Sequence, residues 1–480
     1  VTISDANGTG IAATDISTIA GVTGGTVTVS NNINITGTAT AIATAVGDVN
    51  TFSTTPTATL SNAHNLAQLK AINNAISGTI SLDDYTVALV GSAADVKAAL
   101  DGSFGAAYTG NVTLNDTGSV AAADISTIAG DTTGTVTVSG NMNITGTAAA
   151  ITTAVGNVDT FSGTPTAALS DAHTISQLVT INNALSGTLT LNDYTVALSG
   201  SSADVAAALD GTFAAAYTGT ASTSNAHTLA QLKTINNGTT GTITLNDVTV
   251  ALEGSAADIK AALAGTFAAS YTGNVTITDA NGIGITATDI STIAGATTGT
   301  VTVSNNINIT GTAAEITTAV GNVDTFSGTP TTTLSTAHTL SQLATINTAI
   351  DGANTLNDSS VDLSGTAADV AAALELISSY TGNVALSNAH TLAQLKTINN
   401  ATSGTITLND VTVALVGSAA DIKAALAGTF AASYTGNVTI TDANGTGIAA
   451  TDISTIAGDT TGTVTVSNNI NITGTATEIT

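Results

Sequence analysis

The chain has 480 residues, with six lysines, no arginine and 33 acidic residues, so its net charge is −27. Proteins bind nucleic acids and anionic membrane surfaces through basic residues, so this composition argues against both partners. Cysteine is absent, which excludes disulfides and thiolate metal sites, and no apolar run is long enough for membrane insertion. Aromatic residues make up only 3%, so we expect a core of small aliphatic side chains.

Long internal repeats dominate the sequence. Residues 274–436 closely repeat the sequence of residues 111–273, with an offset of 163 residues, and the stretch SNAHTLAQLKTINN occurs unchanged in both copies. Self-similarity of this kind predicts an array of stacked units. We expect one continuous solenoid over residues 1–480, with repeat blocks at 1–110, 111–273 and 274–436 and a partial block at 437–480. Both ends lie inside a repeat, so we expect the sequence to be a segment of a longer chain.

Four related modules, numbered in chain order, make up every block. They are module one (Asn274–Gly295), module two (Gly299–Val320), module three (Thr331–Gly352) and module four (Thr405–Gly436). In these terms the chain reads 1234, 1234, 34, 1234, 34, 12, which is eighteen modules. Their mean length of about 27 residues is typical of leucine-rich-type coils.

Each module begins with β-branched apolar residues alternating with threonine or serine, which predicts a strand with one aliphatic face. Such runs lie at Val275–Thr278, Val301–Ser304 and Thr405–Leu408. Modules two and four carry a second run, at Ile307–Thr310 and Val411–Leu415. This run either pairs back as a hairpin or continues around a solenoid corner, and we favour the corner because it keeps all modules in phase.

A helix signal closes each module, with apolar residues three or four positions apart. Representative helices are expected at Asp289–Ile293 and Asp421–Leu426, and Gly295 and Gly428 are expected to end them. Two helix starts resemble capping boxes: Thr312 with Glu315, and Ser418 with Asp421. Helices this short need a sheet to pack against, because they are not stable alone in water.

Together these patterns predict a repeat solenoid: a right-handed parallel β-solenoid with short helices in most coils, or βα-solenoid, of about 18 modules. Equivalent strands would pair in parallel, with the helices on the opposite side. At ~4.8 Å per strand layer the array would span on the order of 85 Å.

Histidine and lysine recur at fixed places. All five histidines lie in module three just before its helix (His64, His173, His227, His338 and His390). We interpret them as packing or capping residues, since each is alone in its module and a metal site needs converging ligands. The lysines form three pairs spaced 27 residues apart (Lys70 and Lys97, Lys233 and Lys260, Lys396 and Lys423). We expect them on a solvated helix face, with Lys423 able to reach a carboxylate.

Acidic and amide residues gather where strands end, which is turn chemistry. The weak candidates for calcium ligands among them are Asp83, Asp84, Asp116, Asp193, Asp247, Asp410 and Asp442. Stacking would align such residues in columns, and carboxylate and carbonyl oxygens suit calcium. Neither the calcium loop of EF-hands nor the GGxGxD nonapeptide occurs, so a structural turn ladder is the competing interpretation.

No pattern in the sequence indicates catalysis. There is no cysteine nucleophile, GxSxG turn, phosphate-binding lysine loop or arginine clamp, and no singular segment interrupts the array. Alternate threonines, such as Thr300 and Thr302 or Thr405 and Thr407, would stack into flat arrays. These arrays resemble those of ice-binding β-solenoids, and they also suit a hydrated sheet, a glycosylated surface or lateral packing.

The phrases GTAAEITTAV (Gly311–Val320) and GSAADIKAAL (Gly417–Leu426) resemble the tandem repeats of very large bacterial extracellular proteins. The modules resemble especially those of cyanobacterial and other Gram-negative surface proteins of the β-strand-repeat or haemolysin-like kind, and this resemblance covers essentially the whole chain. This resemblance implies secretion, a cell-surface or filament location, and a structural or adhesive role. The calcium-binding nonapeptide of such proteins is missing here.

Two functional hypotheses follow, neither of them enzymatic. The first is a structural repeat protein that forms an extracellular fibre, stalk or sheath by end-to-end stacking, with other modules or copies of itself as partners. The second is an adhesin arm that binds glycans or another cell surface. An ice-binding threonine array and an enzyme on a β-helical scaffold are less favoured.

Overall fold

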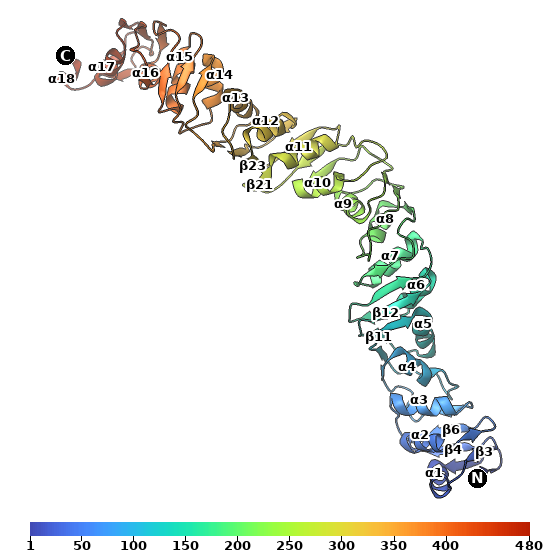
Figure 1. Ribbon diagram of the computed structural model, residues 1–480. Helices are drawn as coiled ribbons and strands as arrows, with labels where there is room; N and C mark the ends of the chain where they lie inside the picture. Colours follow the sequence, from blue (N-terminus) through green and yellow to red (C-terminus); the bar gives the residue numbers. More distant parts are fainter. The chain divides into compact units, whose positions relative to one another are not determined.

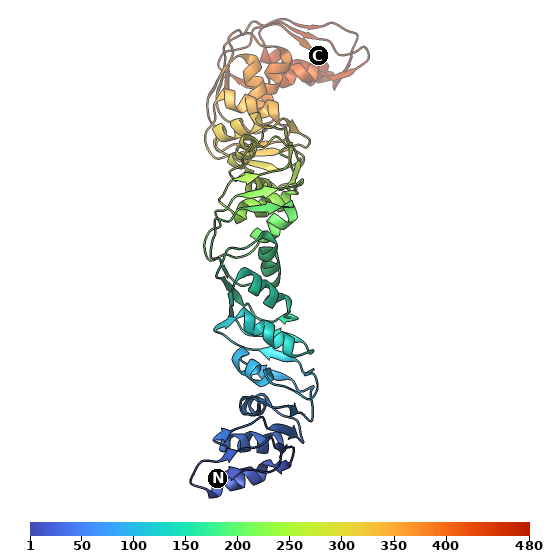
Figure 2. The same cartoon turned by 90° about the vertical axis from the view of Figure 1, so that its right-hand side faces the viewer.

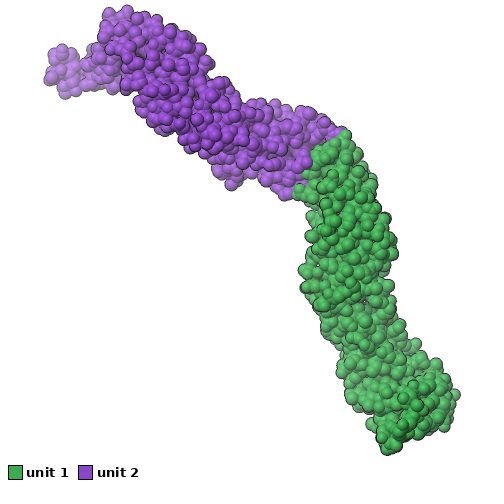
Figure 3. Space-filling view, in the orientation of Figure 1, with its two compact units in different colours: residues 1–227, 234–246, 265–268 green, residues 228–233, 247–264, 269–480 purple.

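A computed structural model describes all residues, 1–480, as a repeat solenoid of α/β coils. Each module forms one coil, in which one or two short strands are followed by one helix. The chain divides into two compact units, one of residues 1–227, 234–246 and 265–268, and one of residues 228–233, 247–264 and 269–480 (Figure 3). The eighteen predicted modules correspond to eighteen helices.

The helices contain between four and ten residues. They are α1 (Ala13–Val22), α2 (Ala39–Asp48), α3 (Leu66–Ala75), α4 (Ala93–Leu100), α5 (Ala122–Asp131), α6 (Ala148–Gly156), α7 (Ile175–Ala184), α8 (Ser202–Leu209), α9 (Leu229–Gly238), α10 (Ala256–Leu263), α11 (Ala287–Ala296), α12 (Ala313–Gly321), α13 (Leu340–Ala349), α14 (Ala367–Leu374), α15 (Leu392–Ala401), α16 (Ala419–Leu426), α17 (Ala450–Asp459) and α18 (Ala476–Ile479). None of them is both long and apolar enough to cross a membrane.

The strands of the first unit form five sheets. Their members, in hydrogen-bonded order, are β1 (Thr2–Ile3), β3 (Thr28–Val29) and β5 (Thr51–Phe52); β2 (Gly10–Ala12), β4 (Asn34–Gly37), β6 (Thr57–Leu60) and β7 (Ile80–Ser81); β8 (Leu89–Gly91), β9 (Val112–Leu114), β11 (Val136–Val138) and β13 (Thr160–Phe161); β10 (Ser119–Ala121), β12 (Asn143–Gly146), β14 (Thr166–Leu169) and β15 (Leu189–Thr190); and β16 (Leu198–Gly200), β17 (Ala221–Thr223) and β18 (Ile243–Thr244).

The second unit also contains five sheets. They are β19 (Leu252–Gly254), β20 (Val275–Ile277), β22 (Val301–Val303) and β24 (Thr325–Phe326); β21 (Gly284–Thr286), β23 (Asn308–Gly311), β25 (Thr331–Leu334) and β26 (Asn354–Thr355); β27 (Leu363–Gly365), β28 (Val384–Leu386), β29 (Thr405–Thr407) and β31 (Thr429–Phe430); β30 (Leu415–Gly417), β32 (Val438–Ile440) and β34 (Val464–Val466); and β33 (Gly447–Ala449) and β35 (Asn471–Thr473).

All strand pairs are parallel, and all of them join different modules except β29 with β31, which both lie in module four. In module two, β22 pairs with β20 and β24, whereas β23 pairs with β21 and β25, so the two runs of one module never pair with each other. The predicted corner is therefore confirmed, and the hairpin alternative is wrong. In module four the sequence predicted a second strand at Val411–Leu415, but this strand, β30, begins only at Leu415. The backbone instead turns after Asp410, whose carboxylate accepts hydrogen bonds from Thr412.

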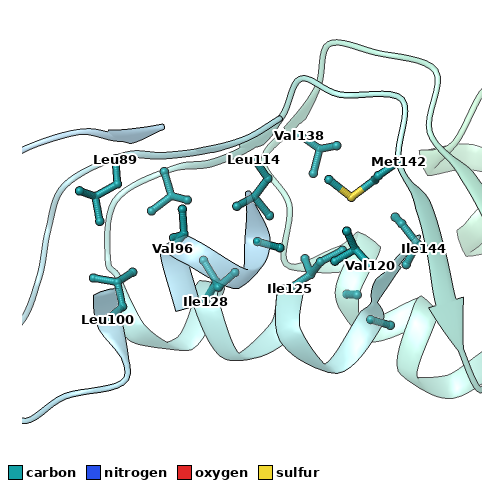
Figure 4. Close-up of a cluster of buried hydrophobic side chains, with 14 of the residues drawn as sticks. Leu89, Val96, Leu100, Leu114, Val120, Ile125, Ile128, Val138, Met142 and Ile144 are labelled. Carbon is teal, nitrogen blue, oxygen red and sulfur yellow. The ribbon is translucent and has the colours of Figure 1, made fainter. Parts of the chain in front are cut away.

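Aliphatic side chains from the strands and helices of successive coils form the core. Figure 4 shows part of it, where strand residues such as Leu89 and Leu114 face helix residues such as Val96 and Ile125. All four of these side chains are fully buried. Within each unit, helices of successive coils lie side by side, as in α3 with α4 and α15 with α16 (Figures 1 and 2).

Both predicted caps form, and the predicted end of α16 at Leu426, just before Gly428, is confirmed, whereas α11 continues past the predicted end at Gly295. Thr312 and Glu315 make a reciprocal capping box, and Ser418 Oγ accepts a hydrogen bond from the Asp421 amide at 3.1 Å. Gly295 lies inside α11, and α16 ends two residues before Gly428. Neither glycine has a positive φ, so these helices do not end in a left-handed glycine turn. The residue after α11 is instead extended backbone that enters the next strand region.

Ile422 tests the packing of α16, because its side chain is fully buried. Ile422→Ala should lower the local free energy of opening by about 2–5 kcal/mol, since it leaves a cavity. Ile422→Val should cost only about 0.5–1.5 kcal/mol, and valine stands at the equivalent Val96, Val205 and Val370. Hydrogen exchange of the α16 amides measures these losses.

The matched control is Val416→Ser, because Val416 is 59% exposed and serine occupies the equivalent positions 199 and 364. This change should alter the opening free energy by no more than about 0.5 kcal/mol. Amides of α1 to α3 provide an internal reference, because repeat arrays open locally. Equal protection in Ile422→Ala and Val416→Ser would contradict the described packing.

Candidate functional site

The polar side chains concentrate at the junctions between successive coils, so we treat these junctions as the candidate site. At the start of α4, the Ala93 amide donates to Asp116 Oδ2, from the next coil, at 2.7 Å. Asp442 does the same for the Ala419 amide of α16. The first amides of a helix lack partners within the helix, so the following coil completes this cap.

The same cap is made by different side chains along the chain. Asparagine makes it for α2, α8 and α14, aspartate for α4, α6, α10 and α16, and threonine for α12. The donors and acceptors are Ala39 and Asn62, Ala93 and Asp116, Ala148 and Asp171, Ser202 and Asn225, Ala256 and Asp279, Ala313 and Thr336, Ala367 and Asn388, and Ala419 and Asp442. Because a neutral amide or hydroxyl serves as well as a carboxylate, hydrogen bonding rather than charge is the shared requirement.

The remaining calcium candidates mostly close local turns. Asp84, Asp193, Asp247 and Asp410 each accept hydrogen bonds from the backbone amide and hydroxyl of the threonine two residues later, at 2.7–2.8 Å. Asp83 is exposed. Turn carboxylates of this kind belong to module four, which never follows itself, so they do not form the expected column. No group of three or more His, Asp or Glu side chains is placed to hold a metal ion.

Module three is linked to module four by a buried histidine and tyrosine. His64 Nε2 lies 3.2 Å from the Tyr108 hydroxyl, and that hydroxyl donates to the Val87 carbonyl at 2.6 Å. A tyrosine has one hydroxyl proton, so it must accept from the imidazole, which therefore carries its proton on Nε2. The same arrangement occurs at His173 with Tyr217, His338 with Tyr380, and His390 with Tyr434.

Burial controls the protonation of these pairs. It lowers the pKa of His64, His173, His338 and His390, although the carboxylate of a nearby turn aspartate, such as Asp84, partly offsets the effect. Burial likewise raises the pKa of Tyr108 well above its usual range. Each of the four histidines is only 4% exposed, and its Nδ1 has no hydrogen-bond partner. The packing role predicted for the histidines fits this environment. The tyrosine partners, which lie about 44 residues further along the chain, were not identified from the sequence.

Every lysine makes an ion pair with an aspartate on the next helix. The pairs are Lys70–Asp95, Lys97–Asp124, Lys233–Asp258, Lys260–Asp289, Lys396–Asp421 and Lys423–Asp452. The lysine side chains are 37–46% exposed, so each pair contributes at most about 1 kcal/mol. The hydrogen bond to Lys70 holds the pKa of Asp95 below its ordinary value. The lysines thus lie on a solvated helix face, as predicted, and all of them reach a carboxylate.

Threonine ladders form on the outer sheet faces. In the second unit, Thr286, Thr310, Thr333 and Thr355 lie opposite one another on consecutive strands. The equivalent row in residues 119–190 contains Ala121 and Ala168 and is therefore interrupted. Asn308 and Thr333 also bond to each other, so part of this surface satisfies its own hydrogen bonds.

One coil departs from the repeat, contrary to the expectation of a uniform array. Asn354 occupies a position that is apolar in the other fourth modules, such as Ile80 and Ile406. Its side chain accepts from Thr332, which is fully buried, and donates to Asn347. Asn347 in turn donates to the Ala373 carbonyl at 2.7 Å. The polar residues therefore satisfy one another and hold this coil to its neighbours.

Two of the surface hollows are open grooves beside helices. One of about 660 Å³ lies between α13 and α14 and is lined by Leu340, Ala344, Thr348 and Asp369. Another of about 610 Å³ lies beside α3, and its lining includes His64, Leu66, Val90 and the Lys70–Asp95 pair. Neither brings together a nucleophile, a base and an anion-binding group.

No protein-family model and no curated protein matches the chain. Among solved structures, it is similar to the LRR ectodomain of the plant membrane receptor kinase GASSHO1/SCHENGEN3 from Arabidopsis thaliana, solved in complex with CASPARIAN STRIP INTEGRITY FACTOR 2. The two chains share 9% identity with a TM-score of 0.17, over 93% of this chain and 60% of the other. A likeness at this level assigns no function.

The helix cap supplied by the next coil is tested at Asp442. Asp442→Ala should lower the opening free energy of α16 by about 0.5–2 kcal/mol, because the Ala419 amide loses its acceptor. Asp442→Asn should retain most of that stability, since asparagine makes the same contact at positions 62, 225 and 388. Hydrogen exchange at the first turn of α16 measures both. A loss as large in Asp442→Asn as in Asp442→Ala would contradict the hydrogen-bond explanation.

The buried histidines make stability depend on pH. Their pKa values are lowered from 6.5 in the folded state, so below pH 6.5 the unfolded chain binds more protons than the folded chain. Stability should therefore be complete above pH 6.5 and fall as the pH drops, by at most about 1.4 kcal/mol per pH unit for each histidine. Thermal denaturation between pH 5 and 8 measures this effect.

Imidazole titration by NMR is the control for this assignment. The four rings should titrate below pH 6.5, and Asp410→Asn should lower the pKa of His390 further, because the Asp410 carboxylate raises it. Titration of these rings at or above pH 6.5 would contradict their burial.

Proposed function

We propose that this chain is a structural repeat scaffold, part of an extracellular fibre, stalk or sheath. Its stacked coils would supply length and stiffness, and its partners would be further coils of the same kind. In this proposal the chain is not an enzyme and has no resident cofactor. The extracellular location rests on the resemblance of its modules to those of large bacterial surface proteins.

The use of its polar residues supports this proposal most strongly. In other proteins, histidine, lysine and aspartate side chains converge to build reactive or metal sites. Here Asp116 and Asp442 cap helices of the preceding coil, all six lysines pair with the next helix, and His64 binds a tyrosine of the next module. These side chains join one coil to the next, which is the chemistry of a scaffold.

An adhesin arm is the second candidate. The outward hydroxyls of the ladder from Thr286 to Thr355 and the open groove beside α3 favour it, because glycans are bound through polar groups on shallow surfaces. The interruption of the equivalent ladder by Ala121 and Ala168 counts against a long ice-binding array.

Electron microscopy and fibre diffraction of the purified chain test the scaffold proposal. We expect elongated particles or filaments with a spacing of about 4.8 Å along the stack. EDTA should leave them unchanged, because the turn carboxylates already accept hydrogen bonds. Loss of order with EDTA would indicate that calcium is a structural ion. Dispersed rods that bind glycans would favour the adhesin. Separate beads on flexible tethers would refute the scaffold.

A further inference from the structure

The groove between α13 and α14 lies where one copy of the repeat lacks a lysine. In three of the five copies of module three, the fifth residue of the helix is a lysine that pairs with an aspartate on the next helix. These pairs are Lys70–Asp95, Lys233–Asp258 and Lys396–Asp421. The fifth residue of α13 is Ala344, whereas α14 carries the equivalent aspartate, Asp369. This coil therefore has the carboxylate of the pair without its ammonium group.

No lysine of the chain reaches Asp369, because all six lysines pair with other aspartates. Asp369 is exposed, and its Oδ2 accepts a hydrogen bond from the Thr366 hydroxyl at 2.7 Å. The equivalent Asp421 uses its two oxygens separately: Oδ2 accepts from Ser418, and Oδ1 accepts from Lys396. Oδ1 of Asp369 is thus the atom that binds a lysine ammonium in the equivalent coil.

The groove beside this carboxylate offers an aliphatic surface. It has a volume of about 660 Å³, and its lining extends from the first residue of α13, Leu340, to the last, Ala349. Leu340, Ala344 and Ala372 contribute apolar walls, and Asp369 is the only charged residue in the lining. A hydrocarbon chain that ends in an ammonium group matches this combination, as the stem and head of a lysine side chain do.

The lining also offers acceptors for a second cation. The hydroxyls of Thr345 and Thr348 donate to the Ser341 and Ala344 carbonyls, at 2.9 and 2.7 Å. Their oxygens are therefore left as acceptors. Thr348 lies in the last turn of α13, where the carbonyl end of a helix attracts cations. It is four residues beyond Ala344, a rise of about 6 Å, which the carbon chain of a short diamine spans.

We propose that this groove binds a linear aliphatic diamine or polyamine. One ammonium group donates to Asp369 Oδ1 in place of the missing lysine, the methylene chain covers Ala344, and a second ammonium group donates to the Thr348 hydroxyl. A small polyamine fits better than a lysine of a partner protein, because the groove has acceptors for two cations and a lysine side chain carries one. The site lies within one coil pair of the second unit, so the inference goes beyond the scaffold function and does not depend on it.

Saturation-transfer NMR of the full chain with diaminobutane tests the proposal, because it detects the methylene protons of a bound ligand. We expect saturable binding with a dissociation constant in the millimolar range, since one exposed ion pair and a short aliphatic contact stabilise the complex only modestly. Physiological salt should suppress non-specific attraction to the chain, whose net charge is −27. Butylamine, which has one ammonium group, should bind more weakly than diaminobutane.

Three variants locate the site. Ala344→Lys should abolish binding, because it supplies the side chain found at positions 70, 233 and 396, whose ammonium pairs with the aspartate. Asp369→Asn should weaken binding about two- to five-fold, the worth of one exposed ion pair. The matched control is Val179→Lys, which adds a lysine at the equivalent position of α7 and should leave binding unchanged. Circular dichroism confirms that each variant is folded.

Three results would overturn the proposal. If Ala344→Lys and Val179→Lys both bind as the unchanged chain does, the amine is attracted to the acidic surface as a whole. If butylamine binds as tightly as diaminobutane, there is no site for a second ammonium group. If a peptide with a single lysine binds more tightly than diaminobutane, the groove receives a partner protein, and the assignment to a polyamine is wrong.

Discussion

The fold depends on one constraint: no coil can bury its own aliphatic face or satisfy its own strand edges. A module of about 27 residues is too small for a core of its own, so its valines, isoleucines and leucines are covered only when another coil lies on each side. Val1 and Val112 illustrate the difference, since these equivalent side chains are 57% and 0% exposed. The parallel register then follows, because only in-phase stacking brings like aliphatic positions together at every layer.

This constraint also decides where polar groups are needed. Each coil is only one layer thick, so the backbone amides that lack partners at the start of a helix lie against the next coil rather than in solvent. Asn62, Asp171 and Thr336 satisfy the equivalent amides of three different coils. Many of the aspartates are therefore consistent with roles in turns and helix caps. Because asparagine can replace aspartate in a cap, the net charge differs between copies of a module while the hydrogen-bond geometry stays the same.

Much of this architecture could be predicted, because period-2 strands, helix signals and module order are local or repetitive properties of the sequence. The contacts between coils could not, since they join residues that are distant in sequence. Nothing near His64 indicates that Tyr108 is its partner, although the regular tyrosine of module four offered a signal. The end of α11 was placed too early, at Gly295, because the extended residue Thr297, which leads into the next strand region, ends this helix in place of a left-handed glycine. Asn354 was overlooked because one residue hardly changes a repeat pattern.

An array of nearly identical modules faces a problem that ordinary domains do not, because many wrong pairings bury almost as much apolar surface as the correct one. Aliphatic stacking alone cannot decide which module follows which. The histidine–tyrosine links and three of the lysine–aspartate pairs join module three to module four, and the other three pairs join module four to module one. Exposed ion pairs add little stability, but a mismatched pair leaves a charge unpaired or a buried polar group without a partner. Among the polar junction contacts, the histidine–tyrosine links and the lysine–aspartate pairs therefore differ with the modules that meet, whereas the helix caps hold coils of different types together in the same way.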